Sequence, residues 1–157
     1  MGLNNKVRPI RELPEVLEAL RLEERKIVLC HGVFDLLHIG HIRYFEAAKK
    51  HGDVLVVTVT PDNYVNKGPD RPAFGQDLRV EAIGALGCVD YVAINEWPMA
   101  VETIQLLEPD FYVKGSDYKD KDKDRTGGIR LEEEAVNSVG GALVFTELPR
   151  HVRRTSD

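Results

Sequence analysis

The sequence predicts a doubly wound α/β fold, in which helices cover both faces of a parallel sheet. Short apolar runs typical of buried strands alternate with longer, partly polar stretches typical of helices, and glycine or proline ends the helical stretches. Strands alternating with helices imply right-handed crossovers and therefore parallel strands. Ligands of such sheets bind beyond the carboxyl ends of the strands, so we expect the functional site in the segments that follow the strands.

Five runs are predicted to be strands because each is short and almost continuously apolar, as expected of a strand buried on both faces. They are Lys26–Cys30, Val54–Val59, Tyr91–Ile94, Phe111–Lys114 and Ala142–Phe145. The helices between them are predicted at Ile39–His51, Asp77–Leu86, Met99–Leu107 and Ile129–Ser138. An amphipathic packing helix at about residues 10–23 is expected before the first strand.

The chain length fits one domain, because 157 residues are enough for one hydrophobic core. We expect a single Rossmann-like domain over residues 1–157 with its catalytic core at 26–147. No run approaches the ~20 apolar residues of a membrane span. The N-terminus has no apolar signal core, and two cysteines are too few for a disulfide framework, so a cytoplasmic protein is expected. A net charge of -5 argues against a protein that coats nucleic acid.

The most informative segment runs from Cys30 to His41, where the first strand gives way to the first long helix. The start of a helix offers unpaired N–H groups and a partial positive charge, which favour a bound phosphate. His38 and His41 lie three residues apart, so both face one side of the helix start. Gly40 leaves no side chain to obstruct a phosphate, and Gly32 is expected to allow close approach to a ligand or a positive φ.

Two alternatives stay open for this segment. One is that the two histidines are structural, one on the surface and the other buried or capping. The other is a zinc site, although no third ligand has a recognisable spacing. Asp35 could orient Mg²⁺ or the substrate, or it could cap the helix that follows.

The segments Gly32–Asp35 and His38–His41 resemble the signature of the cytidylyltransferase-like group of the nucleotidylyltransferase superfamily, which is a strand, a Gly-x-Phe-Asp turn and His-x-Gly-His. The similarity extends over nearly all of residues 26–147. It is strongest to the adenylyltransferase domain of bifunctional heptose kinase/adenylyltransferases, which make ADP-heptose, and next strongest to glycerol-phosphate cytidylyltransferases. The resemblance implies that the chain could be fused to a sugar kinase domain in a longer protein.

The resemblance also implies roles for individual residues. His38, His41 and Lys67 are the expected catalytic residues, because a lysine in the corresponding loop of the resembled enzymes reaches the triphosphate. Asp35 and Asp62 are expected to contact the substrate. The expected nucleotide-binding residues are Gly32, Val33, Phe34, Gly40, Arg71, Arg79, Lys114, Gly115, Asp117, Thr155 and Ser156.

Several of these residues have a second interpretation. Lys67 and Arg71 could belong to a solvated charged loop, and Arg79 could hold its helix through an ion pair instead of binding phosphate. Val113–Tyr118 matches the Lys-Gly-Gly-Asp-Tyr turn of heptose adenylyltransferases with Ser116 in place of a glycine, but it could also be an ordinary capped turn.

The C-terminal segment is expected to be truncated. Superfamily members close the site with a Ser/Thr-rich turn that opens a last helix. Here Val152–Asp157 reaches that point and the sequence stops, so Thr155 and Ser156 are candidates only.

The expected reaction is direct attack of a substrate phosphate on the α-phosphate of an NTP, with Mg²⁺ bridging the phosphates and no protein cluster holding the metal. Three functions remain open: a sugar-phosphate adenylyltransferase using ATP, a cytidylyltransferase using CTP and an alcohol phosphate such as glycerol 3-phosphate, and a nucleotide-binding module without turnover. Relatives are often dimers, and the apolar turn Trp97–Met99 is a candidate homodimer contact.

Overall fold

The structure, a computed structural model, describes residues 5–65, 72–115 and 127–146. Its sheet confirms the predicted fold class: five strands, all parallel, lie in the order β3-β2-β1-β4-β5. All five predicted strands are present within two residues of their predicted ends. The strands are β1 (Ile27–Gly32), β2 (Val54–Val59), β3 (Tyr91–Ile94), β4 (Phe111–Gly115) and β5 (Ala142–Thr146).

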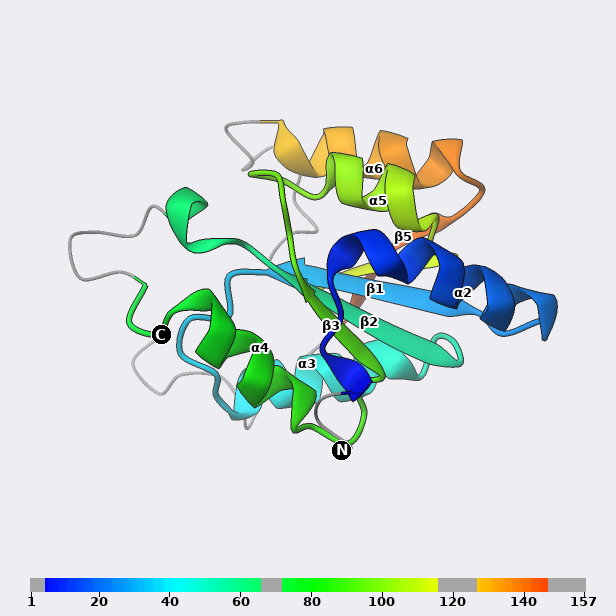
Figure 1. The fold of residues 1–157 in the computed structure, drawn as a ribbon. Coiled ribbons are helices and arrows are strands. Elements are labelled where there is room, and N and C mark those ends of the chain that lie inside the picture. The colour runs from blue at the N-terminus through cyan, green and yellow to red at the C-terminus, as the bar shows by residue number, and fades with distance from the viewer. Residues whose placement is uncertain (1–4, 66–71, 116–126, 147–157) are drawn as a thin grey trace.

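Helices cover both faces of this sheet (Figure 1). On one face lie α3 (Ile39–Lys49) and α4 (Gln76–Gly84), and on the other lie α2 (Leu13–Leu22), α5 (Val101–Leu107) and α6 (Gly128–Ser138). Two short 3-10 segments, η1 (Ile10–Glu12) and η2 (Asp62–Tyr64), complete the described elements.

The helices differ from their predicted ranges at their ends. The predicted N-terminal helix is divided into η1 and α2, because Pro14 stands in the first turn of α2 and suits a helix start. Helix α5 begins at Val101 and not at Met99, because the Asn95 side chain donates hydrogen bonds to the carbonyls of Trp97 (2.8 Å) and Met99 (2.9 Å). Those two bonds hold the segment before α5 as a turn.

Alternation along the strands produces two apolar layers. Ile27 and Leu29 pack with Leu13 and Leu17 of α2 and with α5 and α6. Val28 and Cys30 point the other way and pack against α3 and α4. Burial of both strand faces explains why the strands read as continuous apolar runs. Trp97 packs against the first layer, so this part of the predicted dimer contact contributes to the core.

The chain reverses its direction of winding between β1 and β4. Strand β1 leads into α3 on one face, whereas its neighbour β4 is followed along the chain by α6 on the opposite face (Figure 1). The carboxyl ends of β1 and β4 are therefore the switch point at which doubly wound sheets bind ligands. Within the described residues, no helix is long and apolar enough to cross a membrane.

Candidate active site

The two histidines predicted to bind phosphate are brought together at the start of α3. His38 is the N-cap residue of this helix, and its Nδ1 accepts a hydrogen bond from Gly40 N at 3.0 Å. In return, His41 Nδ1 accepts from His38 N at 3.3 Å. The two rings are stacked with their centroids 3.9 Å apart. The pair is thus a reciprocal capping box in which both side chains are imidazoles.

These hydrogen bonds assign the tautomer of both rings. A neutral imidazole has one donor and one acceptor nitrogen, and each Nδ1 here accepts from a backbone N–H. By this assignment the proton of each ring lies on Nε2. The start of α3 therefore carries two Nε2–H groups beside the positive end of the helix dipole, which is an arrangement suited to phosphate oxygens.

Phe34 packs between the histidine pair and the core residue Phe45. Its ring meets His41 edge-on at 5.4 Å and Phe45 at 5.0 Å between centroids. Its backbone has a positive φ of 52°, an uncommon conformation for a bulky residue that is retained where the surroundings impose it. Phe34 was predicted to bind nucleotide; in the structure, its visible role is to carry the turn and hold the His41 ring.

The two glycines of the turn are explained by ring contacts. A Cβ on Gly32 would lie 2.7 Å from the Phe34 ring, and a Cβ on Gly40 would lie 2.7 Å from the His38 ring. The prediction that Gly32 could need a positive φ is wrong, because Phe34 takes that conformation instead. Gly40 is needed so that the His38 ring can fold over the helix start.

Asp35 does not cap α3, and its predicted role toward Mg²⁺ or the substrate stays a prediction. It is buried, and its carboxylate accepts hydrogen bonds from the backbone N–H groups of Ala73 (2.9 Å) and Phe74 (3.1 Å). The cap of α3 is His38, so the capping alternative is wrong. Asp35 ties the turn after β1 to the segment that precedes α4.

Arg79 makes the contacts of the ion-pair alternative. Arg79 is 2% exposed, and its Nη2 lies 2.7 Å from Asp62 Oδ1. Its other hydrogen bonds run to three backbone carbonyls, those of Val33 (2.8 Å), Thr60 (2.8 Å) and Phe74 (3.1 Å). Four of its five N–H groups are thereby used within the protein. Arg79, Asp62 and Val33, predicted to bind nucleotide or substrate, form a brace behind the site.

His31 and Thr58, which were not among the predicted site residues, form a buried polar group with Lys114 at the carboxyl ends of β1, β2 and β4. His31 Nδ1 lies 2.9 Å from Thr58 Oγ1, and Lys114 Nζ donates to the His31 carbonyl at 3.2 Å. Lys114, a predicted nucleotide-binding residue, is therefore at the switch point, followed by Gly115, beside which there is open space. A sequence feature could have indicated His31, because this polar residue directly follows an apolar run that is predicted to be a buried strand.

His31 makes stability depend on pH. Burial lowers the pKa of its imidazole to about 3, and the Lys114 ammonium adds to this effect. Because the folded-state pKa lies below the ordinary 6.5, stability is complete above pH 6.5 and is lost as the pH falls toward 3. We expect the free energy of unfolding to fall by about 2 kcal/mol between pH 6.5 and about 5. Urea unfolding of the wild type and of His31→Asn checks this; an equally steep loss in the variant would contradict it.

Five predicted site residues lie outside the described residues: Lys67, Arg71, Asp117, Thr155 and Ser156. Among the residues that are described, no three His, Cys, Asp or Glu side chains gather in a group that could hold a metal. That donor set does not fit the zinc alternative. Mg²⁺ bound mainly through phosphate oxygens stays a prediction, since Mg²⁺ commonly takes one or two carboxylates and keeps its other positions for substrate phosphates and water.

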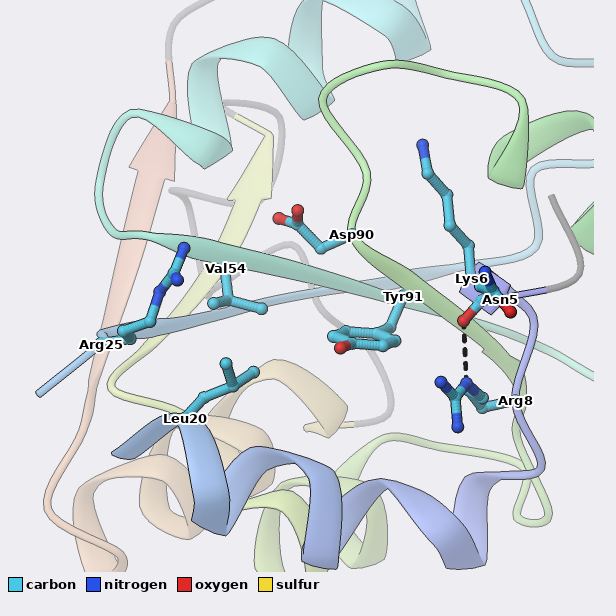
Figure 2. A pocket seen from close by; sticks show the side chains of 8 residues that line it. All are labelled: Asn5, Lys6, Arg8, Leu20, Arg25, Val54, Asp90 and Tyr91. Atoms are coloured by element: carbon cyan, nitrogen blue, oxygen red, sulfur yellow. Dashed lines mark hydrogen bonds between the residues drawn. The ribbon is translucent and has the colours of Figure 1, made fainter. Parts of the chain in front are cut away.

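A pocket of about 640 Å³ lies at the end of the sheet where the strands begin (Figure 2). Val54 and Tyr91 in its wall are the first residues of β2 and β3, and the basic residues Lys6, Arg8 and Arg25 surround them. The acidic residue in the wall, Asp90, already accepts hydrogen bonds from Lys49 Nζ (2.6 Å) and Leu55 N (2.8 Å). This pocket is at the amino ends of the strands and is separate from the histidine pair.

Comparison with known proteins agrees with the architecture and with the histidine segment. The model of the cytidylyltransferase-like family matches residues 29–150. The bifunctional protein HldE of Syntrophotalea carbinolica is 35% identical over 147 residues, covering 92% of this chain and 29% of that protein. HldE of Helicobacter pylori strain G27 is 41% identical over 155 residues, covering 98% of this chain and 33% of that protein. The chain thus spans about a third of the length of these curated relatives.

Two solved structures resemble this chain in fold. The lipopolysaccharide core biosynthesis protein of Thermoplasma volcanium GSS1 is 28% identical, with a TM-score of 0.63 over 80% of this chain and 97% of that one. The pantoate-β-alanine ligase of Francisella tularensis, solved with an ATP analogue and β-alanine, has a TM-score of 0.65 over 96% of this chain and 68% of that one. At 16% identity, the second likeness shows a shared fold.

Proposed function

Because this chain belongs to the cytidylyltransferase-like family of nucleotidyltransferases, we propose that it joins ATP to a sugar 1-phosphate such as heptose 1-phosphate and releases pyrophosphate. The observation that carries this proposal is the pair of stacked imidazoles at the start of α3, whose Nδ1 atoms both accept from the backbone and leave the ring proton on Nε2. The choice of ATP and a sugar phosphate is supported by the resemblance to heptose adenylyltransferases and by the HldE relatives.

The reaction is an in-line displacement at the α-phosphorus. An oxygen of the substrate phosphate forms a bond to this phosphorus, the bond to the oxygen that bridges to the β-phosphate breaks, and pyrophosphate leaves with the electron pair. The substrate phosphate is already ionised near neutral pH, so no general base is required. The protein's contribution is to position the two phosphates and to stabilise the developing charge.

The chain's own residues supply donors to that charge. The Nε2–H groups of His38 and His41 are fixed in direction by their Nδ1 bonds to the backbone, so they need little reorganisation when charge develops on the phosphate oxygens. Lys67, which lies outside the described residues, is proposed to add a cation in the same region. Mg²⁺, when bound through the phosphates of the nucleotide, supplies further charge neutralisation.

A nucleotide and acceptor panel tests the proposal. Pyrophosphate release is measured with Mg²⁺ and either ATP or CTP, against heptose 1-phosphate, other sugar 1-phosphates and glycerol 3-phosphate. We expect release with ATP and a sugar 1-phosphate. Release only with CTP and glycerol 3-phosphate would instead establish the cytidylyltransferase function, to which the name of the matching family points. Nucleotide binding without release from any acceptor would favour a binding module.

A further inference from the structure

A lysine and a glutamate are both buried on the face of the sheet that α5 and α6 cover. Lys114, in β4, is 9% exposed, and Glu132, in α6, is 6% exposed. Charged side chains are seldom buried unless they are paired, because removing a charge from water is costly. Glu132 also interrupts the apolar side of α6, since Ile129 and Val136 at the same helical period are buried in the core.

Glu132 is held at two points that belong to different elements. Tyr112 OH, in β4, donates to its Oε1 at 2.7 Å, and Ala100 N, at the start of α5, donates to its Oε2 at 3.1 Å. Each carboxylate oxygen therefore has one protein donor. The carboxylate is fixed between the sheet and the two helices.

Lys114 lies two residues after Tyr112 on the same face of β4. Its Nζ is 5.4 Å from the centre of the Tyr112 ring and donates to the His31 carbonyl in the neighbouring strand. The tyrosine is thus shared: its ring lies beside the ammonium and its hydroxyl binds the carboxylate. This geometry places the Lys114 ammonium at the β1/β4 switch point.

Within the described residues, the groups that influence Lys114 come from three elements. His31 belongs to β1, Tyr112 to β4 and Glu132 to α6, while Cys30, also in β1, points to the opposite face of the sheet, and Phe145, the partner of Lys114 in the β5 register, is not titratable. Burial lowers the pKa of Lys114, and the Glu132 carboxylate is the main influence that opposes this lowering. The Cys30 thiol is neutral, since burial raises its pKa to about 12.

We propose that Glu132 is a positioning residue: its carboxylate, anchored by Tyr112 and Ala100, fixes the Tyr112 side chain beside the Lys114 ammonium and supplies the counter-charge to this ammonium at the switch point, where it meets the anionic nucleotide. The inference rests on the proposed function for the identity of that ligand. The arrangement between Glu132, Tyr112 and Lys114 stands on the contacts alone. Nucleotide binding at Lys114 thereby depends on a residue of α6 that itself does not touch the nucleotide.

The experiment compares the wild type with Glu132→Gln in the whole chain. Glutamine keeps the size of the side chain and can still pair with Tyr112 and Ala100, but it lacks the charge. The pKa of Lys114 is followed by NMR on protein with ¹³C-labelled lysine, with the Lys114 signal identified by its loss in Lys114→Arg. We expect this pKa to fall by about one to three pH units in Glu132→Gln. The alkaline limb of kcat/KM for ATP should move to lower pH by a similar amount.

Tyr112→Phe is the matched second variant, because it removes one anchor of Glu132 and leaves its charge. Its effect on the Lys114 pKa should have the same direction and be smaller, and it also decides the case if Glu132→Gln does not fold. An unchanged Lys114 pKa overturns the proposal. A lowered pKa with an unmoved kcat/KM profile overturns the role in nucleotide binding and leaves the proposed transferase function standing. The NMR titration does not require turnover, so failure of the transferase proposal remains distinguishable.

Discussion

Replacing His41 by asparagine is expected to lower turnover about 100- to 1000-fold, the range observed when one donor to a developing oxyanion is removed. Asparagine Oδ1 can stand in for Nδ1 and accept from His38 N, so the capping box is retained. It has no donor at the position of Nε2. His41→Gln is the matched variant, because its amide N–H reaches close to that position, and it should retain more activity than His41→Asn.

A second pair of substitutions, at His38, separates capping from phosphate contact. His38→Asn keeps a good N-cap for α3, whereas His38→Ala also loses the cap, at a cost of about 1 kcal/mol. Pyrophosphate release with ATP and heptose 1-phosphate measures turnover, and urea unfolding measures stability. Wild-type turnover in either asparagine variant, with the protein folded, would contradict the assignment of Nε2–H as the phosphate donor.

The fold was predictable because each strand carries its own signal. Strands buried on both faces are continuously apolar, and all five were predicted from their short apolar runs. Helix ends were less accurate where long-range or side-chain contacts decide them. The Asn95 side chain, for example, postpones the start of α5 by binding two carbonyls in the turn.

The candidate site was predictable in part. Contacts between residues close in the sequence could be predicted, whereas contacts between residues far apart in the sequence could not. The contacts of the histidine pair lie within three residues, so spacing alone indicated that both rings share one side of the helix start. Asp35 and Arg79 bind partners up to 39 and 46 residues away, and no local pattern distinguishes a ligand contact from such a tie. Glu132 was not predicted either. It stands beside two other glutamates in α6, and only its position in the helical period, in line with the buried residues of the helix, distinguishes it as the one that points inward.

Two structural layers follow from these contacts. The histidines at the start of α3 and the lysine at the switch point are the residues proposed to contact the phosphates. Asp35 and Arg79 lie behind them and join the turn after β1 to the segment before α4. A family sequence signature contains residues of both layers, because a residue that fixes the turn is as necessary to the site as one that touches the ligand. The signature alone therefore does not distinguish the two roles.

Substitution of Arg79 is expected to have the largest effect on stability. Arg79→Leu leaves the carbonyls of Val33, Thr60 and Phe74 without their donor in a buried region, which should cost about 3–5 kcal/mol. Arg79→Lys should also destabilise, because an ammonium on a flexible stem does not reproduce the planar fork that reaches all of these acceptors. Urea unfolding gives the free energy of unfolding for each variant.

Asp62→Asn is the control, since it removes the ion pair and keeps an acceptor for Arg79. The Asp62 side chain is 45% exposed, so the loss should be about 1 kcal/mol or less. The two possible roles of Arg79 predict different results. If Arg79 is a structural brace, its substitution lowers the free energy of unfolding, and turnover falls because the turn that carries His38 and His41 is no longer held. Wild-type stability in Arg79→Lys together with a raised KM for ATP would show instead that Arg79 binds the phosphates directly.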